Sequence, residues 1–145
     1  MATKIFVNLP VRDLKKSIEF FTSLGYNFNQ QFTDDKGACM VISDDIFVML
    51  LVEPFFKTFI PNQIADTTQT TESIICLSAD SRENVDEMVQ KAVSGGATIY
   101  KEAQDQGFMY GHGYRDLDGH LWEIMWMDTS SVKKDQELQP QQSAV

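Results

Sequence analysis

An internal repeat constrains the fold of this chain more than any other feature. A shift of 68 residues superposes Leu9 on Leu77 and Asp13 on Ser81. In each copy a short apolar run precedes an amphipathic segment that ends at glycine, and further apolar runs follow. Because both copies show the same order of hydrophobic periods, the sequence predicts two β-α-β-β-β modules.

The first module is expected to occupy about residues 4–52. The run 4–11 is short, apolar and rich in β-forming residues, which predicts a strand. Asp13 offers an N-cap oxygen to the amphipathic segment that follows, and Gly25 stands where a helix needs its left-handed C′ residue. Three more strand-like runs separated by turn residues complete this module.

A connector, 53–71, is expected to hold a short helix after Pro54 and then a polar loop. The second module, 72–128, opens with a strand and continues with a helix that Ser81 caps and a glycine pair ends. Its last three strands are predicted at 97–103, 107–116 and 120–128.

These segments amount to a single domain over 1–128, since 145 residues are about one domain's worth. The remaining residues, 129–145, are polar and Gln-rich without an apolar period, so a flexible tail or a loosely docked helix is expected.

The formal net charge of −9 argues against nucleic acid or a membrane surface as a partner, because both are polyanions. No apolar run is long enough to cross a membrane, and the N-terminus lacks the pattern of a signal peptide. Cys39 and Cys76 lie in apolar runs and form no C-x-x-C pair, which is typical of free thiols in a reducing compartment. A cytoplasmic protein is therefore expected.

The front motif "VNLPVRDLKKSIEFFTSLGY" and the closing motif "DLDGHLWEIMW" resemble the vicinal oxygen chelate superfamily. That superfamily includes glyoxalase I, fosfomycin resistance enzymes, extradiol dioxygenases and bleomycin resistance proteins. The resemblance implies an α+β fold, in which two βαβββ modules form a cup-shaped mixed sheet. It also implies a homodimer that completes the cup, and in some members a divalent metal ion at the floor.

The resemblance places the family's four metal-ligand positions on Phe6, Ile74, Met49 or Leu50, and Glu123. Only Glu123 is a side chain that binds a divalent ion well. We therefore expect no cofactor and no metal, with Glu123 as the sole ligand if one binds. A slip of two residues in the alignment leaves one alternative open, a ligand set made of Asn8, Glu72 and Glu123.

Glu123 has two interpretations. In the structural one its carboxylate bonds Tyr110, His112 or Asn8, or pairs with Arg115. In the functional one it faces the cup, where it binds a cationic ligand or acts as a general base. Strand alternation then turns the two tryptophans toward the helices and Met125 toward the cup.

The run 107–116 is dense in aromatic residues. Tyr110, His112 and Tyr114 share one strand face and would supply stacking surface, phenolic donors and a titratable ring. The alternative is a packed aromatic strand with a surface histidine. His120, directly after the turn glycine, is interpreted as a structural turn residue.

The first hypothesis for function is a metal-free, glyoxalase-like protein of the bleomycin resistance type, with a cationic or aromatic ligand in a cup at the module or dimer interface. A rival hypothesis is a lyase or isomerase, or a dioxygenase-like enzyme, with Glu123 and His112 as catalytic residues. In a third, the cup is filled core and the chain is an interaction module. The expected ligand-binding residues are Phe6, Asn8, Met49, Leu50, Ile74, Tyr110, Tyr114 and Met125.

Overall fold

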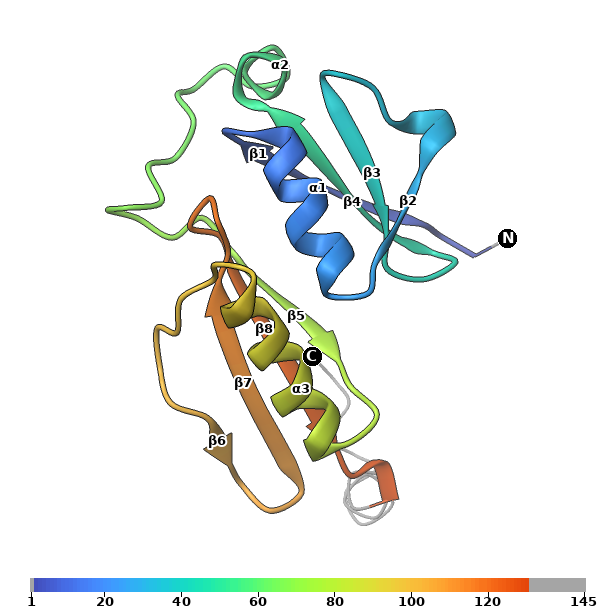
Figure 1. Cartoon of the computed structure of the whole chain (residues 1–145), viewed down its shortest axis with the longest axis vertical. Coiled ribbons are helices and arrows are strands. Elements are labelled where there is room, and N and C mark those ends of the chain that lie inside the picture. Colours follow the sequence, from blue (N-terminus) through green and yellow to red (C-terminus); the bar gives the residue numbers. More distant parts are fainter. Residues whose placement is uncertain (1, 131–145) are drawn as a thin grey trace, which may run out of the picture.

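The computed structural model describes residues 2–130, which form two four-stranded sheets of identical topology (Figure 1). In each module the first strand pairs in parallel with the last, and the other pairs are antiparallel. The first sheet has the strand order β1 (Ile5–Val11), β4 (Ile46–Val52), β3 (Gly37–Val41), β2 (Asn27–Asn29). The second has the order β5 (Ile74–Ser78), β8 (Leu121–Met127), β7 (Met109–Arg115), β6 (Gln104–Asp105).

Each module carries one long helix, and the predicted caps form. The side chain of Asp13 accepts a hydrogen bond from the backbone N–H of Lys16 at 3.1 Å, and Ser81 does the same for Asn84 at 3.0 Å. The chain leaves α1 through Gly25 at φ 104°, a conformation that favours glycine. The helical segments are α1 (Leu14–Ser23), η1 (Gln30–Phe32), α2 (Glu53–Lys57) and α3 (Arg82–Ser94).

The strand predicted at 97–103 is wrong. Only Thr98 pairs in this segment, through two backbone hydrogen bonds with Arg115, and the edge strand of the second sheet is β6 instead. Where the chain leaves the sheet, the side chains of Tyr100 and Lys101 both contact Glu123. Strand alternation would place the neighbouring side chains of Tyr100 and Lys101 on opposite faces, but here both contact the carboxylate of Glu123.

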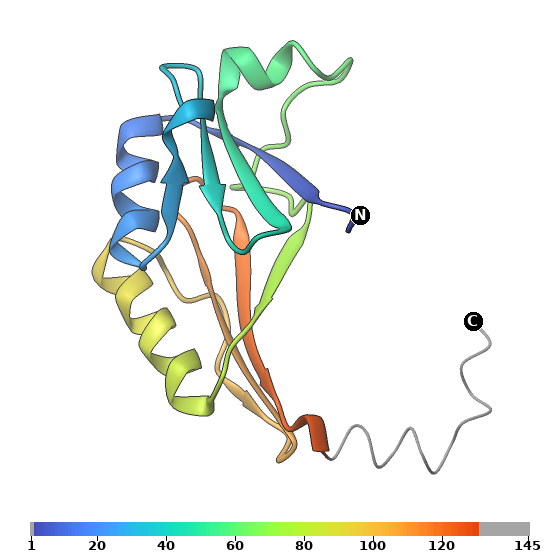
Figure 2. The same cartoon turned by 90° about the vertical axis from the view of Figure 1, so that its right-hand side faces the viewer.

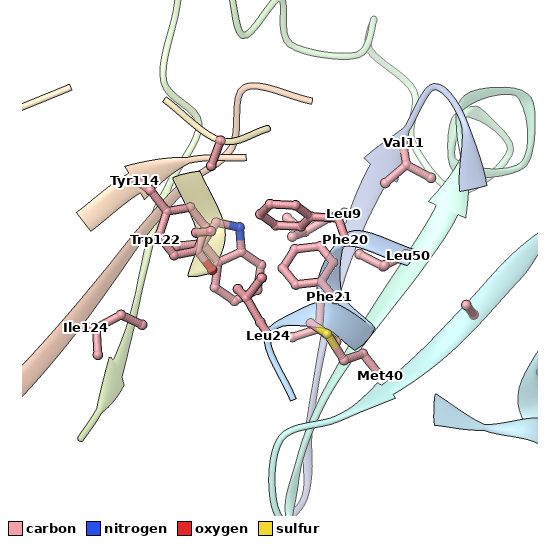
Figure 3. Packing of buried hydrophobic residues seen from close by; sticks show 14 of the residues in the cluster. Leu9, Val11, Phe20, Phe21, Leu24, Met40, Leu50, Tyr114, Trp122 and Ile124 are labelled. Carbon is pink, nitrogen blue, oxygen red and sulfur yellow. The ribbon is translucent and has the colours of Figure 1, made fainter. Parts of the chain in front are cut away.

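Both modules share one hydrophobic core (Figure 3). Phe21 of α1 packs against Trp122 of β8 with ring centroids 5.2 Å apart, and Phe20 lies 6.1 Å from Tyr114 of β7. The helix of the first module therefore packs on strands of the second, so neither sheet has a core of its own.

Figure 2 shows the two long helices, α1 and α3, on the same side of the two sheets, so that among residues 2–130 neither of them covers the opposite side. We call that opposite side the open face. Within residues 2–130, no helix combines the length and apolar character that crossing a lipid bilayer requires. The prediction of a tail at 129–145 lies, apart from its first two residues, outside the described residues.

Candidate functional site

The register of the strands identifies the residues of the open face. Leu9 and Leu50 pair with each other and are buried under α1, so the neighbouring pair of Asn8 and Met49 points to the other side. The same reasoning in the second module places the pair of Cys76 and Glu123 on the open face, with Ile74 and Met125 beside it.

The residues at the family's ligand positions divide into exposed and buried ones. Phe6 is 52% exposed and Ile74 is 55% exposed, both on the open face. Met49 is half-buried on the same face, whereas Leu50 is completely buried on the helix side. The register thus decides between the two alternatives: Met49 occupies the open face, and Leu50 does not reach it.

Glu123 is engaged by two residues that the sequence did not single out. Its Oε1 forms an ion pair with Nζ of Lys101 and accepts a hydrogen bond from the hydroxyl of Tyr100 at 3.3 Å. The glutamate side chain is 16% exposed and the lysine side chain is 39% exposed, so the pair is partly desolvated. None of the four partners expected for this carboxylate makes the contact.

The glycine at position 113 is the sequence feature that points to this contact between Tyr100 and Glu123. It pairs with Glu123 across the β7–β8 ladder, and a Cβ built on it would lie 2.8 Å from the Tyr100 hydroxyl. The absence of a side chain there gives Tyr100 a path over the sheet to the carboxylate.

The electrostatics of the open face follow from this arrangement. Burial raises the pKa of Tyr100 to about 12, and the negative charge and hydrogen bond of Glu123 add to the effect. Burial also raises the pKa of the Cys76 thiol, with Glu123 raising it further and Lys101 opposing. Cys76 is therefore a neutral thiol at neutral pH and a poor nucleophile.

A small hollow lies beside the ion pair. Its volume is about 30 Å³, far below the roughly 300–1,000 Å³ of ordinary small-molecule pockets. A ligand on this face would lie on an open surface of the single chain rather than inside it. The hollow is lined by Lys101, Gln104, Gln106, Met109, Gly111, Glu123 and Met125.

The aromatic residues of β7 point away from the open face. Tyr110, His112 and Tyr114 pair with Trp126, Ile124 and Trp122, so they share the helix side with those residues. Because Glu123 occupies the other face of β8, the register separates His112 from it.

Their contacts agree with this placement. Tyr114 is completely buried in the core, and the Tyr110 hydroxyl donates to Asp86 of α3 at 2.6 Å. His112 lies with Nε2 at 3.2 Å from the carbonyl oxygen of Lys101. Tyr110 and Tyr114 therefore do not line the cup as expected.

The residues present do not fit a divalent metal ion. In the described part of the chain, no three His, Cys, Asp or Glu side chains converge on one point. The alternative ligand set does not form either, since Asn8 donates to the carbonyl oxygen of Phe6 at 3.1 Å and Glu72 bonds His120 at 2.6 Å. Around Glu123 the donors are an ammonium, a phenol and a neutral thiol, which are poor ligands for such an ion.

Comparisons with known proteins agree with this fold. A family model described as "Bleomycin resistance protein-like N-terminal" matches residues 3–43. No curated protein matches the chain.

Several solved structures are similar over most of the chain. A hypothetical protein, SA1046 from S. aureus, is 28% identical, with a TM-score of 0.74 over 87% of this chain and 94% of that one. A glyoxalase/bleomycin resistance protein/dioxygenase family enzyme from Burkholderia phytofirmans PsJN is 15% identical, with a TM-score of 0.73 over 87% and 99%. The fosfomycin resistance protein FosX from Listeria monocytogenes is 19% identical, with a TM-score of 0.63 over 87% and 93%.

The fold is thus that of the glyoxalase/bleomycin resistance/dioxygenase proteins. Together with the family match, it confirms the resemblance to the vicinal oxygen chelate superfamily that the sequence motifs indicated.

Proposed function

We propose that this chain is a metal-free, glyoxalase-like protein of the bleomycin resistance type, which binds a small molecule on the open face around Glu123. The ion pair between Glu123 and Lys101 carries the proposal. The lysine ammonium already supplies the positive charge that this carboxylate would otherwise share with a metal ion.

The open face favours an aromatic ligand over a cationic one. The charge of Glu123 is compensated by Lys101, which removes the simplest attraction for a cation. Phe6 and Phe47 stack with their ring centroids 4.9 Å apart, Met49 lies on the same face of β4, and Ile74 adds apolar surface in the second module. Such a surface suits a flat, largely uncharged molecule.

The proposal includes a homodimer in the cytoplasm. The single chain offers only a shallow hollow beside the ion pair, so a bound molecule needs a cover, and a second copy can provide it. The free thiols of Cys39 and Cys76 support a reducing compartment.

Metal analysis and calorimetry test the proposal directly. We expect purified protein to contain no stoichiometric metal, and Zn²⁺, Ni²⁺ and Mn²⁺ to give no saturable heat. Bleomycin and fosfomycin, which appear in the names of the similar proteins, are the first two ligands to titrate. One metal ion bound per chain and lost in Glu123→Gln would overturn the metal-free assignment. Light scattering shows whether the chain is a dimer.

A second function, a lyase or isomerase, is favoured by one observation. Glu123 lies beside Lys101, so a base and a cationic donor are adjacent. In such a reaction the carboxylate would take a proton from a carbon next to a carbonyl group, and the ammonium would donate a hydrogen bond to the carbonyl oxygen. His112 takes no part in this scheme because its strand register turns it to the helix side.

Two substitutions separate binding from catalysis. If the chain only binds, Lys101→Met and Glu123→Gln change the affinity for a ligand found by calorimetry and no product forms. If it is an enzyme, Glu123→Gln abolishes turnover while the ligand still binds. Glu87→Gln and Lys91→Met make the same replacements at exposed positions of α3, on the other side of the sheets, and are the matched controls that should preserve both.

A further inference from the structure

His120 lies at the junction of three segments and is 3% exposed. Its Nδ1 is 2.6 Å from a carboxylate oxygen of Glu72, and its Nε2 is 2.7 Å from the carbonyl oxygen of Pro10. Pro10 belongs to β1 of the first module, Glu72 lies where the connector meets the second module ahead of β5, and His120 immediately precedes β8. One imidazole ring therefore touches both modules and the segment between them.

The two contacts fix the number of protons on the ring. A carbonyl oxygen only accepts hydrogen bonds, so Nε2 of His120 must carry a hydrogen. The carboxylate of Glu72 also accepts, so Nδ1 carries one as well. A neutral imidazole has a single N–H and can satisfy only one of these partners, whereas the imidazolium satisfies both.

The connector is attached at the same place by a second contact. The Thr67 hydroxyl donates to the carbonyl oxygen of Asp118 at 2.6 Å, beside Gly119, whose φ is 84°. A Cβ on Gly119 would collide with the Thr67 side chain, so the turn leaves room for the connector to dock. The docking therefore depends on a neutral hydrogen bond at Thr67 and a charge-assisted one at Glu72.

The groups facing His120 favour its charged form. A cavity of about 240 Å³ at this junction is lined by His120 together with Glu53 of α2, Asp66 of the connector, Asp118 of the turn and Arg12, whose guanidinium pairs with Asp118 at 3.2 Å. The backbone N–H of His120 also donates to Oδ1 of Asp116 at 2.9 Å. Among residues 2–130, the charged groups that line this cavity or contact His120 are one guanidinium and five carboxylates, those of Glu53, Asp66, Glu72, Asp116 and Asp118.

Burial and the neighbouring acceptors act in opposite directions on the pKa of His120. Burial by itself lowers the pKa of His120, but Asp116, the Pro10 carbonyl and Glu72 outweigh it, and the pKa lies above its ordinary value of 6.5. A histidine whose pKa is raised by folding stabilises the folded state below the ordinary pKa. That stabilisation is lost as the pH rises through the folded-state pKa.

We propose that His120 is a protonation-dependent clasp, which holds the connector onto the junction of the two modules while the ring carries two protons and releases Glu72 when it loses one. The proton lost is the one on Nδ1, because the Glu72 side chain is 28% exposed and water can solvate its carboxylate, whereas the Pro10 carbonyl is fixed in β1 and keeps the N–H on Nε2. Release of Glu72 loosens the segment that follows connector residues 64–68, which form part of the wall of the junction cavity.

Nuclear magnetic resonance of the imidazole nitrogens tests the protonation state on the intact chain. The chain has two histidines, so His112 is an internal reference in the same spectrum. At pH 6 both ring nitrogens of His120 should show protonated chemical shifts, and as the pH rises Nδ1 alone should change to an unprotonated shift. A spectrum with one unprotonated nitrogen in His120 at pH 6 would overturn the proposal.

Hydrogen exchange of backbone amides tests the release. Protection factors of amides in 66–72, corrected for the intrinsic pH dependence, should fall roughly tenfold or more as His120 titrates. Amides of β3 and β4 should keep their protection through the same range. Equal protection of the connector on both sides of the titration would contradict the clasp.

A pair of substitutions assigns the effect to the contact. Glu72→Gln keeps an acceptor for Nδ1 but removes the charge, so both the His120 titration and the loss of connector protection should move to lower pH together. Glu53→Gln removes a carboxylate from the same cavity that has no hydrogen bond to His120, and it should move them less. Equal shifts in the two variants would show that the total negative charge near His120, and not its hydrogen bond to Glu72, sets the titration, and this would contradict the clasp.

Discussion

The two modules share a backbone topology and strand register but differ in what they place on the open face. Asn8 and Met49 in the first module occupy the positions of Cys76 and Glu123 in the second. On the helix side both modules bury large residues at equivalent positions. The comparison indicates that packing against the helices preserves the repeat, whereas the open face is free to carry different chemistry.

Replacing Trp122 should have the largest effect, and it asks whether the modules unfold as one. Trp122 is completely buried, touches Phe21 of the other module and donates to Asp116 at 2.8 Å. Trp122→Ala should lower the free energy of unfolding by about 3–5 kcal/mol. Val48→Ala, at the equivalent position of the first module, should cost roughly 2 kcal/mol.

Both variants should unfold in one transition, because the core is shared. Chemical denaturation followed by circular dichroism and by fluorescence measures this. Two separate transitions, one for each module, would contradict the shared core. Trp122→Phe gives a milder test if the alanine variant does not fold.

The second module has a glycine, Gly113, where the equivalent residue of the first module, Cys39, has a side chain. Gly113→Ala removes this difference by adding a Cβ. The new Cβ would lie 2.5 Å from the carbonyl oxygen of Trp122 and 2.8 Å from the Tyr100 hydroxyl. We expect a loss of about 1–3 kcal/mol. Gly111→Ala is the matched control, because its Cβ meets its neighbours at ordinary contact distances. Similar losses in both variants would argue against crowding at Tyr100.

Tyr114→Phe should be neutral or stabilising by up to about 1 kcal/mol. The Tyr114 hydroxyl is buried and has no hydrogen-bond partner among residues 2–130, and burial strongly raises its pKa. The equivalent residue of the first module, Met40, places no polar group in the core. Thermal unfolding measures the change. A loss above about 1 kcal/mol would show that the hydroxyl is paired in solution.

Glu123→Met, which introduces the residue found at the equivalent position 49 of the first module, should have the smallest effect on stability. The ion pair with Lys101 is partly exposed, so less than about 1 kcal/mol should be lost. The pKa of Tyr100, raised to about 12, should fall toward 10 because one cause of the shift is removed. Ultraviolet titration measures this, with Tyr100→Phe identifying the signal. An unchanged titration would leave burial as the only cause.

Much of the frame could be predicted from local sequence. Asp13 and Ser81 cap the two long helices as predicted, because capping depends on residues three positions apart. Alternation correctly placed Trp122 and Glu123 on opposite faces of β8. The wrong prediction of a strand at 97–103 shows the limit of local sequence patterns. A β-forming composition does not reveal that Tyr100 contacts Glu123 instead of continuing a sheet.

The sequence by itself determined the repeat, the order of the elements and the poor metal-binding character of three of the four family positions, because these depend on spacing and residue type. Tertiary structure alone decided which residues contact Glu123 and the two histidines. Strand register turned His112 to the helix side, and a chain excursion brought Lys101 to Glu123. Folding across 110 residues brought His120 to Pro10. Such contacts depend on the registers and crossings of distant segments, on which local periodicity places no constraint.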